Sequence, residues 1–442
     1  MAGDFECVKA ELQRLRSGWL PVVLFVTHDL GGGVETHVRE LVAALRGRAV
    51  VLFLRPGPLG GMVSLMGLQR RLSFIGFEGL LEALSWVGFD RVHVHHVAGF
   101  PAGVADALLR LGVPLDLTLH DHSIINGNPT LTDRSGVFDE RALLECMPDG
   151  DVWLEQELRL LASKADRIFL PSARQKRLIE AFLPDLELQV RPPPEAEGER
   201  TLPVEARPSH AAGSFRVLCL GSFTLEKGAS VLAAVARLAK SRRMAIDFIL
   251  LGESLYPMPG CVRQFGRYDE AELQALISEM SPDILWLPAQ CPETWSYTLS
   301  AGVDCGLPIL ASDLGALAER LEGRPLSWLF SHRASAEGWL DELMRVRSLI
   351  EGGGRCSWLM PGAPVFYGRG GAYLSSVRGG QHEGGALVWL PAALRDGERE
   401  PVAWRRWWLR RLVRLRGHPL FGLLGSKLPK KWLRMVRRFL MR

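Results

Sequence analysis

A chain of 442 residues is too long for one hydrophobic core and predicts two domains with additional segments. Its seven scattered cysteines argue against a disulfide framework or a zinc site and favour a reducing cytosol. The net charge of +4 is unevenly placed, because residues 401–442 hold 13 Lys and Arg but no Asp or Glu, so the rest of the chain is acidic. The N-terminus carries acidic residues unlike a signal peptide, and no run approaches the roughly 20 apolar residues of a membrane span.

The first half of the chain alternates apolar runs with helix-like segments. A buried strand is expected at residues 21–28, followed by a glycine stretch and a helix at 34–45. Further strands are expected in AVVLFLRP, FDRVHVHHV, VPLDLTLHD and ADRIFLPS. This alternation predicts a parallel, doubly wound sheet in a first domain, residues 1–190.

Residues 191–213 are rich in Pro, Glu and small residues and are interpreted as a linker. The alternation then restarts with strands in FRVLCLGSF, AIDFILLG, DILWLPA and LPILASD, and with helices at 228–240, 270–279 and after Glu293. A second α/β domain is therefore expected at 214–350. The glycine-rich residues 351–400 have little periodicity and receive no assignment.

Two features of the first domain are candidates for ligand binding. Gly32 and Gly33 stand between a strand and a helix, where backbone N–H groups can approach a phosphate; the alternative is a tight turn. His120 follows a strand and could hydrogen-bond a sugar hydroxyl or a leaving group. The nearby His93, His95 and His96 raise the question of a metal, but His93 and His95 alternate with apolar residues along a strand, so no metal site is expected.

The second domain offers a cation and a carboxylate. Lys227 precedes a helix and can reach a diphosphate, although it could be a solvated lysine. Glu293 follows a buried strand and could accept hydrogen bonds from sugar hydroxyls. Ser296, Tyr297 and Thr298 lie near the N-terminus of the next helix, where amides can face a diphosphate; the alternative is a helix-capping loop.

Taken together, these motifs resemble retaining glycosyltransferase family four, over about residues 21–329. The phrase PETWSYTLS resembles the branch found in bacterial O-antigen and surface-polysaccharide synthesis. Within this resemblance Gly32, Gly33 and Glu35 match a GGxE motif, Lys227 matches a phosphate-binding lysine, and His120 matches the family histidine. Glu293 matches the first glutamate of a pair, the one near the donor sugar.

The resemblance implies the GT-B fold, in which two Rossmann-like domains face a cleft. It implies sugar transfer from a nucleotide-diphosphate sugar with retention, to a polysaccharide or lipid-linked acceptor, without a metal or other cofactor. Glu293 and His120 would be the catalytic residues, and the donor-binding residues would be Gly32, Gly33, Lys227, Ser296, Tyr297, Thr298 and Asp304.

Two positions depart from the family pattern. The second glutamate, which usually holds the ribose, falls on Ala301, and an arginine falls on Ser222. Asp304 could substitute for the missing carboxylate. Three alternatives follow: a nucleotide-sugar epimerase of the same architecture, a degenerate binding partner of another transferase, and a nucleic-acid binder. The last is suggested only by the basic tail, and no recognition motif supports it.

The basic tail, residues 401–442, is predicted to hold amphipathic helices. Lys430, Lys431, Arg434, Arg437 and Arg438 gather on one side of a helical wheel, and Trp432 lies on the other. The segment around Trp404, Trp407 and Trp408 is similar. This pattern favours binding to an anionic membrane surface, and hence a cytoplasmic protein peripheral at the inner face of the cell membrane. The alternative is a helix docked on the acidic body.

Overall fold

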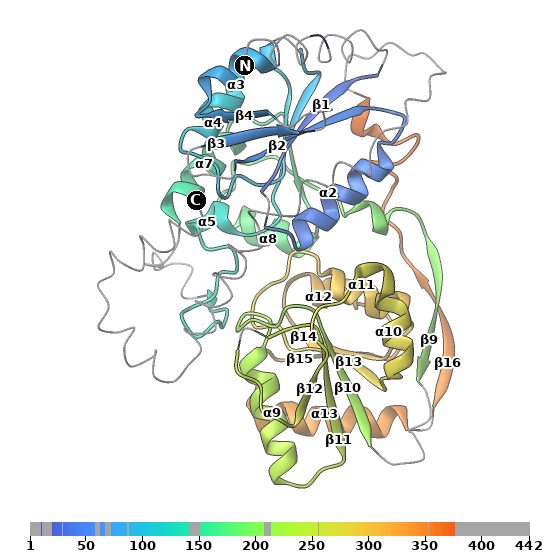
Figure 1. Ribbon diagram of the computed structural model, residues 1–442. Helices are drawn as coiled ribbons and strands as arrows, with labels where there is room; N and C mark the ends of the chain where they lie inside the picture. The colour runs from blue at the N-terminus through green and yellow to red at the C-terminus, as the bar shows by residue number, and fades with distance from the viewer. Residues whose placement is uncertain are drawn as a thin grey trace, which may run out of the picture.

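The computed structural model describes residue 10 and residues 20–375, except 29, 58–61, 67–71, 86–87, 141–150, 207–213, 255 and 352. The described residues form two α/β domains, which lie one above the other in Figure 1. A ribbon of two strands runs along one side of the second domain. The basic tail and its predicted membrane residues lie outside the described residues.

The first domain is built on an eight-stranded sheet in the order β4-β3-β2-β1-β5-β6-β7-β8. Its strands are β1 Val22–Val26, β2 Val50–Pro56, β3 Met62–Met66, β4 Leu72–Ile75, β5 Arg91–Val94, β6 Leu115–Thr118, β7 Arg167–Leu170 and β8 Leu188–Val190. The predicted parallel arrangement is confirmed for β2, β1, β5, β6, β7 and β8. By contrast, β3 is antiparallel to β2, and β4 is antiparallel to β3. The reason is length, since the few residues between β2 and β3 cannot hold a crossover helix.

Helices cover both faces of this sheet. Alternate residues of β1 point to opposite sides: Val22 and Leu24 join one apolar cluster, whereas Val23 and Phe25 join another with Leu41 of α2. The helix predicted at 34–45 is confirmed as α2. The helices of this domain are α2 Gly33–Ala44, α3 Glu78–Ser85, α4 Val104–Leu109, α5 Ser123–Asn126, α7 Val152–Ala162 and α8 Ala173–Glu180.

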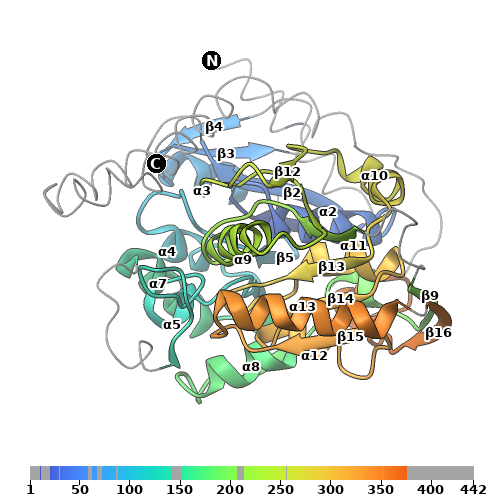
Figure 2. The same cartoon turned by 90° about the horizontal axis from the view of Figure 1, so that it is seen from below.

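The second domain has a fully parallel six-stranded sheet in the order β12-β11-β10-β13-β14-β15. Its strands are β10 Phe215–Leu220, β11 Ile246–Leu251, β12 Val262–Gln264, β13 Ile284–Leu287, β14 Ile309–Ser312 and β15 Ser327–Phe330. The helical segments are α9 Ala229–Ser241, η2 Glu270–Glu272, α10 Leu273–Met280, α11 Tyr297–Asp304, α12 Gly315–Arg320 and α13 Ala336–Ile350. The helices α9 and α13 pack on one face, and α10, α11 and α12 on the other, so this sheet is also doubly wound (Figure 2).

The two domains are joined by more than one crossing of the chain. After η1, Pro194–Ala196, the predicted linker contains β9, Arg200–Ala206, which pairs antiparallel with β16, Gly354–Met360 (Figure 1). The chain then returns to the first domain and ends its described part near η3, Ala372–Leu374. There Phe366, Tyr367 and Tyr373 are buried in the cluster that contains Phe25. This return lies in the glycine-rich segment that shows little periodicity in sequence and received no assignment.

Candidate functional site

The predicted donor residues of the second domain lie where its strand order reverses. The chain leaves β10 toward Lys227 and leaves β13 toward Glu293, and these two strands are neighbours from which the chain winds in opposite directions. In open parallel sheets, ligands bind at the carboxyl ends of strands at this reversal. The topology therefore brings together two residues that are 66 positions apart in sequence.

Gly228 fixes the loop that carries Lys227. Its φ is +86°, and a Cβ atom there would lie 2.0 Å from the backbone oxygen of Pro288. No other residue type fits both the torsion and the space, so the loop can pack against the end of β13. The first helical residue of α9 follows at once, which directs the amide end of this helix to the same edge.

The Glu293 loop is held by the N-terminus of α12. The backbone oxygen of Glu293 accepts from the amide of Ala316 at 2.7 Å, and a Cβ on Gly315 would lie 2.4 Å from that oxygen. Ser296, the N-cap of α11, has φ +80° and ψ +90°, which is unusual for a residue with a side chain. Such backbone strain costs about 1–3 kcal/mol and is concentrated at functional sites.

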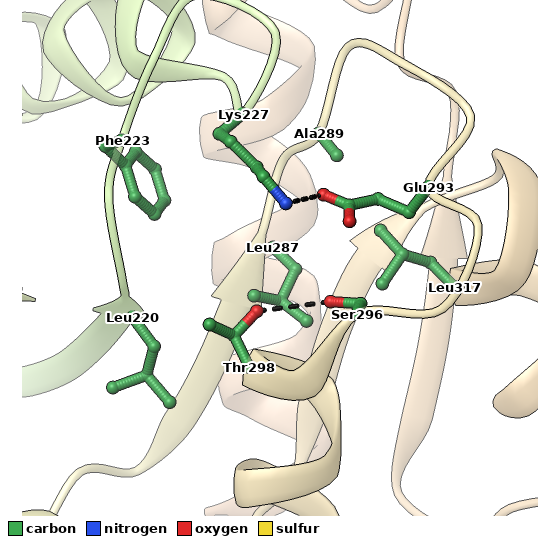
Figure 3. A pocket seen from close by; sticks show the side chains of 9 residues that line it. All are labelled: Leu220, Phe223, Lys227, Leu287, Ala289, Glu293, Ser296, Thr298 and Leu317. Atoms are coloured by element: carbon green, nitrogen blue, oxygen red, sulfur yellow. Dashed lines mark hydrogen bonds and ion pairs between the residues drawn. The ribbon is translucent and has the colours of Figure 1, made fainter. Parts of the chain in front are cut away.

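A hollow of about 240 Å³ lies between these loops. It is lined by Leu220, Phe223, Lys227, Leu287, Ala289, Glu293, Ser296, Thr298 and Leu317, as Figure 3 shows. Lys227 and Glu293 point toward each other across it and form an ion pair, and the Ser296 and Thr298 hydroxyls lie 3.1 Å apart below them. Burial alone would lower the pKa of Lys227, but the carboxylate of Glu293 outweighs it and the net shift is upward. The lysine is therefore a cation at neutral pH.

The first domain contacts the Glu293 loop through residues 120–122, here called the His120 segment. The Thr294 hydroxyl donates to the backbone oxygen of His120 at 2.8 Å, and a ring nitrogen of His122 lies 3.0 Å from the backbone oxygen of Pro292. On the other side, a Cβ on Gly33 would contact the ring of Tyr297 at 3.7 Å. His120, Gly32, Gly33 and Tyr297 are thus beside the Lys227–Glu293 hollow rather than in its lining.

Gly32 is the N-cap of α2, with φ +78°, and its surroundings leave room for a ligand at the helix N-terminus. Glu35 lies in the first turn of α2. Both of its carboxylate oxygens accept hydrogen bonds from Arg55, at 2.9 and 3.0 Å, so this carboxylate is already occupied. The carboxylate of the GGxE motif therefore links α2 to β2. Within this motif, the backbone at Gly32 and Gly33 is the part that is left available to bind a ligand.

A polar network beneath the motif was not foreseen from sequence. Glu195 of η1 accepts from the indole nitrogen of Trp295 at 2.6 Å and from the hydroxyl of Ser300. The guanidinium of Arg320 lies 3.8 Å from the centre of the Trp295 ring and donates to the backbone oxygen of Ser296 at 2.9 Å. Only Trp295 and Ser300 stand inside the recognisable phrase, and nothing in the spacing of Glu195 and Arg320 signals their role.

Among the described residues that line the hollow, Glu293 is the only acidic one, so none of them takes the place of the second glutamate. Ala301 packs against the apolar layer of α11 and β14. Asp304 is the last residue of α11, about 10 Å along the helix from Tyr297, and it pairs with Arg200 of β9 at 3.2 Å. The structure thus gives Asp304 a different partner from the one suggested by sequence.

The histidines at the edge of the first sheet have separate surroundings. His93 is fully buried between the Tyr373 hydroxyl and the Thr118 hydroxyl, each at 2.8 Å, and His96 pairs with Asp121 at 3.0 Å. His95 instead has a ring nitrogen 3.2 Å from one of His120. Burial, the largest influence, holds the pKa of His95 and of His120 well below the usual value, so both rings are neutral at pH 7.

Comparison with known proteins agrees with this architecture. Residues 31–193 match the family model described as Glycosyltransferase Family 4. No curated protein sequence matches the chain significantly. Among solved structures, the chain is similar to sucrose-phosphate synthase from Thermosynechococcus elongatus, with 15% identity and a TM-score of 0.50 over 92% of this chain and 100% of that one. The chain has the GT-B fold.

Other similar structures are HepE from Anabaena, solved with UDP-glucose, and the lipopolysaccharide outer core galactosyltransferase WaaB. HepE has 15% identity and a TM-score of 0.49, over 75% of this chain and 93% of that chain. WaaB has 13% identity and a TM-score of 0.47, over 75% and 94% respectively. The family match lies in the first domain, which contains Gly32, Gly33 and His120, whereas Lys227 and Glu293 lie outside it. Within the described residues, no helix combines the length and apolar character needed to cross a bilayer.

Proposed function

We propose that the chain transfers a sugar from a nucleotide-diphosphate donor, with retention of anomeric configuration, to a polysaccharide or lipid-linked acceptor in cell-surface polysaccharide synthesis. The observation that carries this proposal is the Lys227–Glu293 pair, held at the strand-order reversal of a GT-B fold and faced by the His120 segment. The family match to the first domain supports the same reaction class.

The chemistry follows from the charges. As the bond between sugar and diphosphate breaks, negative charge grows on the leaving diphosphate, and a fixed cation stabilises it. The Lys227 side chain is 41% exposed, so its ammonium group can move from Glu293 to a phosphate. We propose that this cation and the amides at the start of α9 and α11 offset the charge, so that transfer needs no metal.

The carboxylate and the histidine act on the sugar in this proposal. Glu293, with an 11% exposed side chain, is left free to accept hydrogen bonds from the sugar hydroxyls when Lys227 turns to the diphosphate. His120 lies on the facing domain and supplies a neutral imidazole that can donate to or accept from the sugar. The hollow is too small to enclose a nucleotide sugar, so the donor would extend from it toward Gly32 and Gly33.

A second function is favoured by one specific observation. Ala301 presents a methyl group where the family pattern places a carboxylate for the ribose, and Asp304 is engaged with Arg200. A chain with a weakened nucleotide site could be a binding partner of an active transferase. The loss of one charge-assisted hydrogen bond lowers affinity by about 1.5–3 kcal/mol, or one to two decades, which weakens a site without removing its reactive end.

A panel of nucleotide-diphosphate sugars tests the two functions. The proposal expects at least one donor to raise the melting temperature and to be turned over, with release of the nucleoside diphosphate, when membranes containing lipid-linked glycans are supplied. Binding without turnover would support the partner function. The absence of both would contradict the transferase proposal.

The proposed acceptor would place the protein at the inner face of the cell membrane, through the basic tail. Each basic residue near an anionic surface contributes on the order of 1 kcal/mol, so 13 of them can hold the chain reversibly. Sedimentation with liposomes should show binding that needs anionic lipid and weakens in high salt. A chain truncated after Glu400 should not sediment, and its retention on liposomes would refute the role of the tail.

A further inference from the structure

Three histidines from three different elements meet at the carboxyl edge of the first sheet. His37 lies on α2, His95 follows β5 and His120 follows β6. Each offers one ring nitrogen, and these three atoms all lie within 4.8 Å of one another. The strand order of this sheet reverses between β1 and β5, so the group stands at the place where such a sheet binds ligands.

His37 is the member that packing does not explain. It is 1% exposed, yet neither of its ring nitrogens has a hydrogen-bond partner among the described residues. Nε2 of His95 also lacks one in this part of the chain. By contrast, both nitrogens of the neighbouring His93 are bonded. A buried polar atom without a partner costs about 1–3 kcal/mol, so the two unpartnered nitrogens of the His37 ring indicate that something else binds this ring.

The arrangement suits a metal ion better than a hydroxyl ligand. Nδ1 of His95 and Nε2 of His120 are hydrogen-bonded at 3.2 Å. The same spacing is close to the roughly 3.3 Å that separates two nitrogens on one tetrahedral ion with bonds of about 2.05 Å, so an ion can replace the shared proton with little movement of the rings. Three imidazoles without a carboxylate or thiolate favour zinc and its neighbours over magnesium or calcium.

We propose that His37, His95 and His120 form a binding site for a first-row transition-metal ion of the Zn²⁺ class. His120 is only partly buried, which leaves the outer side of the site open to a fourth ligand such as water. The site lies beside the Lys227–Glu293 hollow and shares His120 with the proposed transfer site. An ion held through Nε2 of His120 leaves Nδ1 of that ring to donate a hydrogen bond to the sugar. Metal binding can be measured without turnover, so its test does not depend on the transfer reaction. The sequence argued against a metal because His93 and His95 alternate with apolar residues along a strand. It did not point to His37, which is 58 residues from His95 and is brought to it only by the fold.

The competing explanation is packing. The His37 ring lies edge-on to His120 with centres 4.8 Å apart, and aromatic contacts of this kind also stabilise a core. In that case the ring nitrogens bind no ion, and the histidines can be exchanged for glutamine with no effect on metal affinity.

The test is Zn²⁺ titration of the full-length, chelator-stripped protein by calorimetry, with Co²⁺ as a spectroscopic probe. We expect one ion per chain and the intense visible bands of tetrahedral Co²⁺ with nitrogen ligands. His37→Gln and, separately, His95→Gln should each weaken Zn²⁺ binding at least tenfold and remove the bands. The control His332→Gln changes a buried histidine of the second domain, paired with Asp313, and should bind Zn²⁺ like the wild type.

The melting temperature of each metal-free variant shows whether it folds, and an affinity is compared only for a folded chain. Two variants are used so that one of them reports if the other does not fold. If wild type, His37→Gln and His95→Gln bind Zn²⁺ with the same affinity, or if wild type binds none at micromolar concentrations, the proposal is overturned.

Discussion

Replacement of Lys227 by methionine separates the catalytic use of this cation from its structural use. Methionine keeps most of the apolar stem and removes the ammonium group. The Lys227 side chain is 41% exposed, and a pair this accessible adds only about 0–1 kcal/mol to the free energy of unfolding. The Glu293 side chain, however, is 11% exposed and would lose its charged partner. We therefore expect Lys227→Met to lower stability by about 1–3 kcal/mol.

The effect on transfer should be much larger. A donor fixed opposite a developing negative charge is worth about 2.7–4 kcal/mol in the transition state, or 10²–10³ in kcat. Because the same interaction is weaker in the ground state, the KM for the donor should change less than kcat. The assay is release of nucleoside diphosphate at saturating donor, alongside urea unfolding of the same preparations.

The matched control is the double variant Lys227→Met/Glu293→Gln. It removes the unpaired carboxylate and should recover most of the lost stability, yet it should stay as inactive as the single variant. A single variant that keeps more than a tenth of wild-type kcat would refute the assignment of Lys227 to the leaving group. Recovery of activity in the double variant would show that the pair matters only for folding.

Three further predictions concern neighbouring positions. Ala301→Glu should tighten nucleoside diphosphate binding by one to two decades in calorimetry, since it supplies the missing ribose ligand; an unchanged Kd would refute the account of the weakened site. Ser296→Gly should be about 1 kcal/mol more stable than Ser296→Ala in urea, because both lose the hydroxyl but only glycine relieves φ +80°; equal stability would show that the loop is unstrained. Burial, followed by the electrostatic effect of His96, lowers the pKa of His28 to about 3 in the folded chain, from 6.5. Below pH 6.5 the unfolded chain therefore binds a proton at His28 that the folded chain does not, and the free energy of unfolding falls by about 1.4 kcal/mol per pH unit. His28→Gln should reduce the slope of unfolding free energy between pH 6.5 and 4 by that amount, and an unaltered slope would contradict the low pKa.

The alternating parallel strands and helices of both domains could be predicted from the sequence. Apolar runs such as residues 21–28 and 284–287 are buried on both faces, so their composition alone indicates parallel strands, and the strands confirm it. The strands β3 and β4, which extend the sheet to one edge, were not expected, because a short hairpin after an apolar run looks like any other loop in sequence. The return of Phe366 and Tyr373 to the first domain was also missed, since it depends on contacts with residues far away in sequence.

The candidate site likewise contains residues that could be predicted from sequence and residues that could not. Lys227, Glu293, Ser296 and Thr298 stand next to strand ends and were found as motifs, and all four line one hollow. Glu195 and Arg320 come from segments without a motif, and only the packing of η1 and α12 under the Glu293 loop brings them to Trp295. Residues placed by topology could be predicted, whereas residues placed by tertiary packing could not.

The most direct test of the central claim is the reaction of Glu293→Gln with the donor identified by the panel. The amide keeps the size of the side chain but loses the charge that holds the sugar hydroxyls. The account predicts that wild type releases nucleoside diphosphate and forms a product whose anomeric configuration, read by NMR, is that of the donor. It also predicts that Glu293→Gln releases at least 100-fold less with its melting temperature within a few degrees of wild type. Wild-type turnover by Glu293→Gln, or a product of inverted configuration, would contradict it.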